Sequence, residues 1–128
     1  MNSRKKTILV VEDDRNLIEL FSLTLDYLGY DVICCGNGNE ALDIFTRRNS
    51  SIDAVVLDMI LPGMHGLDCL RHFKSTNPSV PVIVCTGSGL MNQESMLKEC
   101  GAYEIIAKPF ITGTIGQVLD KAINNTVS

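Results

Sequence analysis

Residues 7–14 read Thr7-Ile8-Leu9-Val10-Val11-Glu12-Asp13-Asp14, an apolar run that ends abruptly in three acids. The apolar part has the length of a β-strand and shows no alternation, as expected for a strand covered on both faces. A second apolar run, Asp53–Leu57, is followed in the same way by Asp58. The two segments predict buried strands that each end at a carboxylate.

Segments with helical spacing alternate with the strands. After the first strand, Leu17, Phe21, Leu25 and Leu28 recur with a helical period, and Gly29 is a natural stop. The remaining expected strands are Asp31–Cys35, Val80–Cys85 and Tyr103–Ala107, and the remaining helices surround Ala41–Phe45, Leu67–Phe73, Leu90–Cys100 and Ile115–Ile123. The pattern therefore contains five strand–helix pairs.

Strands that alternate with helices form βαβ units, because parallel neighbours need a crossover connection. The sequence thus predicts an α/β fold, a (βα)5 doubly wound parallel sheet. Tyr103–Ala107 is short and mixed in polarity, which suggests an edge strand. No linker or repeat interrupts the 128 residues, so one domain is expected.

Composition excludes several classes of function. The formal charge is −4 and the pI about 5.0, so no basic face for direct nucleic-acid binding is expected. No apolar stretch reaches the roughly 18 residues of a membrane helix, and no signal peptide is recognisable. Five cysteines without ligand spacing indicate reduced thiols in the cytoplasm. His65 and His72 lack a partner at ligand spacing, so a loop or surface role is expected.

In open parallel sheets, ligands bind beyond the carboxyl ends of the strands. The residues expected there are Glu12, Asp13, Asp14, Asp58, Thr86, Gly87, Lys108 and Pro109. Each has an ordinary explanation when taken alone. An acid after a strand is commonly a helix cap, a loop threonine is a turn residue, and Lys-Pro is a common surface dipeptide. Their convergence on one rim argues for a site.

Carboxylates about 5 Å apart repel by roughly 3 kcal/mol per pair at an effective dielectric near 20. A hard divalent cation relieves this repulsion, and magnesium is the natural choice for an all-oxygen rim. One carboxylate could then attack phosphorus and form an acyl phosphate. Lys108 and the Thr86 hydroxyl would neutralise or bond the equatorial oxygens of the transferred group.

Four motifs resemble the receiver domains of two-component response regulators, in particular the chemotaxis single-domain type. They are Ile-Leu-Val-Val-Glu12-Asp13, Val-Val-Leu-Asp58-Met-Ile-Leu-Pro62-Gly-Met-His-Gly66, Val-Ile-Val-Cys-Thr86-Gly87 and Ala107-Lys108-Pro109-Phe110. The resemblance covers about residues 7–124. It implies a flavodoxin-like, CheY-like sheet with strand order 2-1-3-4-5, and a single receiver domain over residues 1–128 without an output domain.

The resemblance also implies roles for the acids. Asp58 would be the phosphoacceptor and would become a 4-aspartylphosphate. Asp13 and Asp58 would ligate Mg²⁺ directly, together with the backbone carbonyl of Ile60. Glu12 stands where the family usually has Asp, and it would act through a metal-bound water. Asp14 is expected to be a helix cap.

Further implied roles concern the switch. Thr86 would move to bond the phosphoryl group, Lys108 would pair with it, and Lys108-Pro109 would be a cis peptide. Ile105 occupies the position of the family's switch aromatic and has no ring to rotate inward. Ile60 would place an apolar side chain over the site, where slow hydrolysis of the phosphorylated aspartate is expected.

The function implied is a phosphorylation-activated signalling switch of a phosphorelay, not an enzyme proper. Its partners would be a sensor histidine kinase or phosphotransfer protein and an unidentified output protein. Signals would leave through the face built by the fourth helix, fifth strand and fifth helix, which would also serve a homodimer. No nucleic-acid or membrane contact is expected.

Two other classes of function place similar residues after a strand. A haloacid-dehalogenase-type phosphatase also uses a nucleophilic aspartate there, but it needs a second Asp where this chain has Ile60. A flavodoxin-like electron carrier needs a phosphate loop after the first strand, where Glu12-Asp13-Asp14 would repel the FMN phosphate. No GxxxxGK[ST] loop is present, which excludes a P-loop nucleotide hydrolase.

Overall fold

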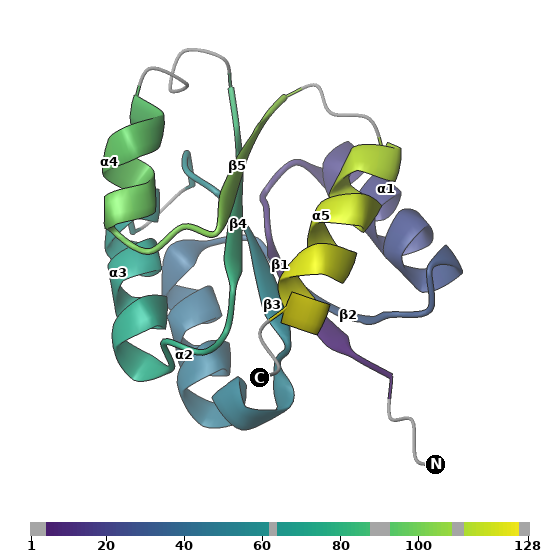
Figure 1. Cartoon of the computed structure of the whole chain (residues 1–128), viewed down its shortest axis with the longest axis horizontal. Helices are drawn as coiled ribbons and strands as arrows, with labels where there is room; N and C mark the ends of the chain where they lie inside the picture. Colours follow the sequence, from purple (N-terminus) through teal and green to yellow (C-terminus); the bar gives the residue numbers. More distant parts are fainter. Residues whose placement is uncertain (1–4, 62–63, 88–92, 109–111, 126–128) are drawn as a thin grey trace.

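The structure is a computed structural model that describes residues 5–61, 64–87, 93–108 and 112–125. Strands and helices alternate along the chain (Figure 1). The strands are β1 (Thr7–Val11), β2 (Asp31–Cys35), β3 (Ala54–Asp58), β4 (Val82–Thr86) and β5 (Glu104–Ala107). The helices are α1 (Arg15–Tyr27), α2 (Gly38–Arg48), α3 (Gly66–Thr76), α4 (Glu94–Glu99) and α5 (Thr112–Asn125), with a short 3-10 turn η1 (Asn49–Ser51) after α2.

All strand pairs are parallel, and their order is β2-β1-β3-β4-β5. The predicted α/β fold and strand order are therefore confirmed. The predicted starts of β3 and β4 were too early, by one and two residues. Asp53 lies before β3, where its side chain accepts a hydrogen bond from the Thr7 amide. Asp58 and Thr86 are the last residues of their strands rather than the first residues after them.

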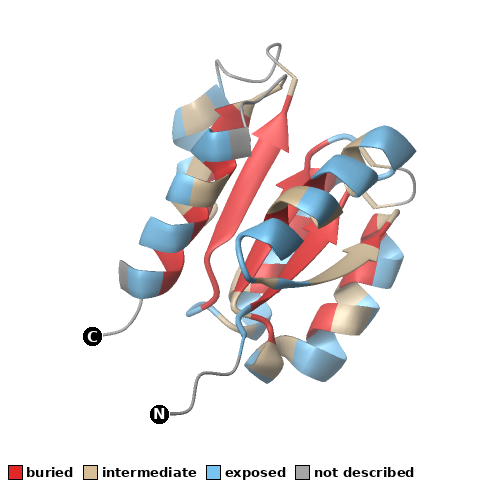
Figure 2. Cartoon of the chain, turned by 90° about the vertical axis from the view of Figure 1, so that its right-hand side faces the viewer, coloured by how far each residue is buried: buried red, intermediate tan, exposed pale blue. Residues whose placement is uncertain are grey.

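The helices cover both faces of the sheet (Figure 1). One core cluster joins the sheet to α2, α3 and α4, and its aromatic centre is the edge-to-face pair of Phe45 and Phe73. The other cluster joins the sheet to α1 and α5 through Phe21, Leu25 and Leu119, among others. β1, β3 and β4 are buried along their whole length, as their unbroken apolar sequences predict (Figure 2).

Helix ends follow local signals in the sequence. Asp14 caps α1 as predicted, by accepting hydrogen bonds from the amides of Asn16 and Leu17. Gly29, with φ of 96°, takes the left-handed conformation that follows α1. α4 falls within the predicted Leu90–Cys100 and ends one residue before Cys100, while residues 90–92 of that prediction lie outside the described residues.

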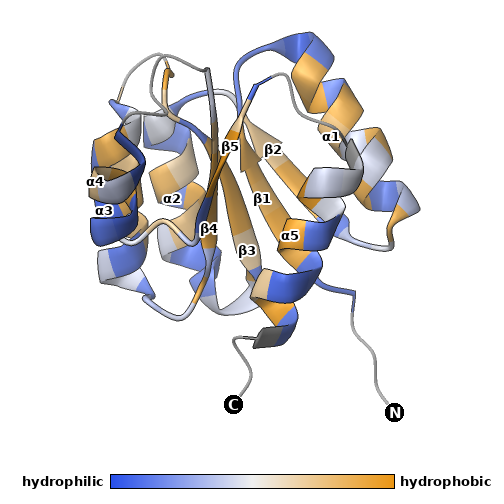
Figure 3. Ribbon diagram, turned by 45° about the horizontal axis from the view of Figure 1, so that its top comes forward, coloured by the Kyte–Doolittle hydropathy of each residue, from blue (hydrophilic) through white to orange (hydrophobic). Residues whose placement is uncertain are grey.

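Polarity divides the molecule into an apolar sheet and polar outer helix surfaces (Figure 3). None of the described helices is long and apolar enough to cross a membrane. All five cysteines are free thiols, and Cys35, Cys69 and Cys85 are buried. Burial raises the pKa of Cys35 and Cys85 to about 12 and that of Cys69 to about 11, so these thiols act as small core residues.

Candidate functional site

The predicted site residues meet at the carboxyl ends of the strands. They line an open cleft of about 480 Å³, formed by Glu12, Asp13, Asp14, Asp58, Ile60, Gly87 and Lys108. The register explains this convergence. Leu57 pairs with Val11 across β1 and β3, and Asp58 pairs with Cys85 across β3 and β4. Asp58 therefore lies at the same level as the acids that follow β1 and the residues that end β4.

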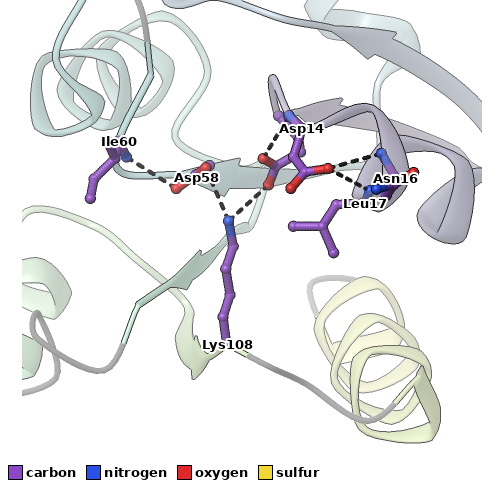
Figure 4. Close-up of polar contacts among 7 residues, drawn as sticks. Asp14, Asn16, Leu17, Asp58, Ile60 and Lys108 are labelled. Carbon is purple, nitrogen blue, oxygen red and sulfur yellow. Dashed lines mark hydrogen bonds and ion pairs between the residues drawn. The ribbon is translucent and has the colours of Figure 1, made fainter.

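Lys108 is held between two carboxylates. Its Nζ lies 3.1 Å from Glu12 Oε1 and 3.1 Å from Asp58 Oδ2, and Figure 4 shows the lysine reaching up to Asp58. The Lys108 amide is fixed by a 2.7 Å hydrogen bond to the Thr86 carbonyl. Burial alone would lower the pKa of Lys108, but its bonds to Asp58 and Glu12 outweigh burial and raise it. The ammonium group is therefore firmly charged.

Glu12 is a buried acid, with 2% of its surface exposed. Its Oε2 accepts a hydrogen bond from the Asp14 amide at 3.1 Å, while Oε1 receives Lys108. Burial raises the pKa of Glu12, and the negative charge of Asp58 adds to this effect. The side chain thus ties the acidic loop after β1 to the lysine after β5.

The acids of the cleft could hold a metal ion. Oxygen atoms of Glu12, Asp13 and Asp58 all lie within 4.8 Å of one another, and Asp13 is exposed to solvent. Such an all-oxygen set with an open side fits a hard cation that keeps several waters, as Mg²⁺ does. The Ile60 amide donates a 3.0 Å hydrogen bond to Asp58 Oδ1, so the backbone of Ile60, whose carbonyl is the third predicted ligand, adjoins this cluster (Figure 4).

Thr86 lies below the rim of the cleft and is fully buried. Its Oγ1 has no hydrogen-bond partner among the residues that the structure describes. Because an unpaired buried hydroxyl is costly, a hydrogen-bond partner for this oxygen would stabilise the protein. Gly87 follows at the wall of the cleft, where a Cβ would meet nothing within 4 Å.

The other predicted residues are placed as follows. The Ile60 side chain is 70% exposed and stands at the edge of the cleft. Ile105 is 5% exposed and packs in the core cluster on the side of α2, α3 and α4, so it points inward already. Pro109 lies outside the described residues, and its predicted cis bond stays a prediction.

His65 has a role that sequence reasoning missed. The expected loop or surface position is correct, since the residue is exposed, but its side chain also caps α3 by accepting the Leu67 amide hydrogen bond. Histidine is not among the preferred capping residues, so its residue type gives little sign of this role. The available signal was its position just before a helical run.

Known proteins resemble this chain over most of its length. The profile of the response regulator receiver domain family matches residues 8–120. The sporulation initiation phosphotransferase F of Bacillus subtilis is 34% identical over 89% of this chain and 90% of its own length. The probable transcriptional regulatory protein TcrX of Mycobacterium tuberculosis is 36% identical over 81% of this chain, which spans only 44% of that relative.

Solved structures agree with these matches. A response regulator receiver domain protein from Clostridium thermocellum superposes with a TM-score of 0.89 and 32% identity, over 94% of this chain and 95% of its own. The receiver domain of the sensor histidine kinase PA1611 from Pseudomonas aeruginosa has a magnesium ion coordinated in its active site cleft. It superposes with a TM-score of 0.84 and 26% identity, over 94% of this chain and 99% of its own. With the family profile spanning most of the fold and the cleft, this chain belongs to the response regulator receiver domains.

Proposed function

We propose that this chain is a phosphorylation-activated switch in which Asp58 accepts a phosphoryl group. The observation that carries the proposal is the placement of Asp58 at the strand end, bonded to Lys108 Nζ at 3.1 Å and clustered with Glu12 and Asp13 within 4.8 Å. A nucleophilic carboxylate, a fixed cation and a metal-binding cluster are the parts that phosphoryl transfer requires.

The general properties of the receiver domain family support this proposal. Receiver domains are regulatory phosphoacceptor domains rather than enzymes in the ordinary sense. They bind Mg²⁺ at an acidic site, and they interact with histidine kinases or phosphotransfer proteins. For this chain, we propose a histidine kinase or phosphotransfer protein as the phosphoryl donor, an unidentified protein as the output partner, and the cytoplasm as the place of action.

Asp13, Asp58 and the Ile60 carbonyl would hold Mg²⁺ directly, with Glu12 acting through a water. When bound, the ion neutralises the crowded carboxylates and the charge on the transferred group. Glu12 is already engaged by Lys108 and by the Asp14 amide. That engagement supports an indirect role for Glu12 and leaves the exposed Asp13 as a direct ligand.

The chemical step is a displacement at phosphorus. A carboxylate oxygen of Asp58 forms a P–O bond as the P–N bond of a phosphohistidine breaks, and the imidazole nitrogen keeps the electron pair and takes up a proton. With acetyl phosphate, a P–O bond breaks instead and acetate leaves. Lys108 stays beside the reacting oxygens because Glu12 and the Thr86 carbonyl anchor it.

The readout would begin at Thr86. Its buried, unpaired Oγ1 would turn to the phosphoryl group, and Ile105 on the adjacent strand would repack. β5 is tied to α4 because Lys98 Nζ on α4 lies 3.7 Å from Glu104 Oε1 on β5. This link supports a signalling face that includes α4 and β5, and α5 is proposed as its third element; the same face would also serve a homodimer. The exposed apolar Ile60 at the cleft edge supports slow hydrolysis of the phosphorylated aspartate.

Intact mass spectrometry after incubation with acetyl phosphate and Mg²⁺ tests the proposal. The wild type should gain one phosphoryl group, and Asp58→Asn should gain none. Asp68→Asn, which alters an exposed acid on α3, is the matched control and should be phosphorylated like the wild type. Phosphorylation of Asp58→Asn to the wild-type extent would refute the assignment.

A further inference from the structure

Helix α3 begins on a titratable cap. The His65 carbonyl accepts the Cys69 amide at 3.1 Å, and His65 Nδ1 accepts the Leu67 amide at 3.1 Å. The backbone of His65 is extended, with φ of −63° and ψ of 141°, as the residue before a helix requires. The imidazole therefore satisfies one of the amides that the first turn of a helix leaves without an intrahelical partner.

This bond depends on the charge of the imidazole. A neutral histidine has one ring nitrogen free to accept, whereas a protonated histidine carries N–H groups on both and accepts nothing. Protonation would also place a positive charge at the helix end where the macrodipole is positive. Both effects act in the same direction. The usual neutral caps, serine, threonine and asparagine, undergo no such change near neutral pH.

Few titratable groups surround His65 among the described residues. It lines a pocket of about 210 Å³ between the β3–α3 segment and α4, and the other lining residues, such as Leu67, Met96 and Leu97, carry no titratable side chain. On its own helix, Asp68 is the acid of the first turn. On α4, Glu94 is paired with Lys98.

We propose that His65 is a proton-sensitive cap that fixes the start of α3 when neutral and releases it when protonated. The consequence reaches the segment after β3, because Gly66 packs against Met59 so closely that a Cβ there would come within 2.5–2.9 Å of three Met59 backbone atoms. Mild acid would thus loosen the contact that supports the residue next to Asp58. This device works in the unphosphorylated protein and does not depend on the proposed function.

Thermal unfolding of the full chain between pH 8 and pH 5.5 tests the inference, because histidines change charge in this range. His65→Asn keeps a capping acceptor that does not titrate. As the pH falls, the Tm of His65→Asn should rise by about 3–5 °C relative to that of the wild type. This is the effect expected when the wild type loses one helix cap. Carboxylates that titrate in both proteins cancel in this difference. His72→Asn, at the exposed histidine of α3, is the control and should follow the wild-type profile.

A second measurement isolates the cap itself. The hydrogen-exchange protection of the Leu67 amide should fall at pH 5.5 in the wild type and stay constant in His65→Asn. His65→Ala should lose this protection at every pH. Parallel Tm profiles for the wild type and His65→Asn, or an unchanged Leu67 protection factor in the wild type, would overturn the proposal.

Discussion

At the amino ends of the strands, Lys74 donates to the carbonyls of Pro78 and Val80 at 2.9 Å each, while at the carboxyl ends Lys108 is shared by the carboxylates of Glu12 and Asp58. Lys74 reaches carbonyls only four and six residues further along the chain, whereas Lys108 reaches acids 96 and 50 residues away. Lys74 joins neutral groups, and the Asn77 side chain nearby likewise donates to a neutral partner, Asn49. These polar groups at the amino end of the sheet are paired with one another.

The carboxyl end is arranged differently. Three carboxylates cluster there, two of them bonded to one ammonium group, and the Thr86 hydroxyl is buried without a partner among the described residues. Folding of this end is therefore less favourable than it would be with a complementary ligand in place. The difference teaches that polar groups at one end of the sheet satisfy one another, whereas those at the other end are left to be satisfied by the cation and phosphoryl group of the proposed function.

Replacing each lysine by methionine should give the largest difference in stability between the two ends of the sheet. Lys108→Met should destabilise the metal-free protein by about 3 kcal/mol, because it leaves two buried carboxylates without a cation. Lys74→Met should cost about 2 kcal/mol, since it removes charge-assisted hydrogen bonds but leaves no buried charge behind. Urea denaturation measures both. Equal losses would mean that the two ends do not differ electrostatically.

Magnesium should act on the carboxyl end alone. At a concentration about 100-fold above its Kd, Mg²⁺ should stabilise the wild type by about 2.7 kcal/mol, seen as a rise in Tm. Asp13→Asn should be more stable than wild type without metal and should lose the response to Mg²⁺. Asp26→Asn, an exposed acid on α1, should keep the full response. An identical Mg²⁺ shift in Asp13→Asn would argue against the site.

The unpaired hydroxyl of Thr86 gives a third test. Thr86→Val replaces it with a methyl group of similar shape, and it should stabilise the metal-free protein by about 1 kcal/mol because a buried polar group is removed. Chemical denaturation at neutral pH measures the gain. A clear loss of stability would show that this oxygen already has a partner in the folded protein.

The smallest expected effect is the pH dependence carried by Glu12. Its pKa is raised by burial and by Asp58, so the folded protein holds this proton more tightly than the unfolded chain. Its contribution to stability is thus present below the ordinary glutamate pKa and is lost as the pH rises through the raised pKa. Without metal, Glu12→Gln should gain stability relative to wild type as the pH rises from the ordinary glutamate pKa into the neutral range. A constant difference across that range would contradict the shift.

The sequence was sufficient for the architecture, because buried parallel strands and amphipathic helices have distinct periods. The ends of the strands were predicted less accurately. Asp53 and Val80 look like strand residues, but β3 begins only after Asp53 and β4 only after Pro81. The Asp53 side chain accepts a hydrogen bond from the Thr7 amide, and Pro81 has no amide hydrogen to donate to a neighbouring strand. The short η1 turn went unpredicted because it has no periodic pattern.

For the candidate site, the sequence predicted which residues stand at the ends of the strands but not which of their side chains touch. That Asp58, Thr86 and Lys108 would share one rim follows from parallel topology. The bridging of Glu12 and Asp58 by one lysine, the burial of the Thr86 hydroxyl and the outward position of Ile60 depend on packing between distant segments. Residue spacing carries no information on those contacts. The assigned chemical roles stay predictions.

The bond between Lys108 and Glu12 joins positions 96 residues apart, and the bond between Lys108 and Asp58 joins positions 50 apart. On a chain that grows from its amino terminus, the acids emerge from the ribosome long before their counter-ion. The cluster must remain mutually repulsive until the last strand is made and docked. A truncated or stalled product could then form part of the sheet but would lack the lysine that finishes the cleft, so only completed chains would be competent to receive a signal.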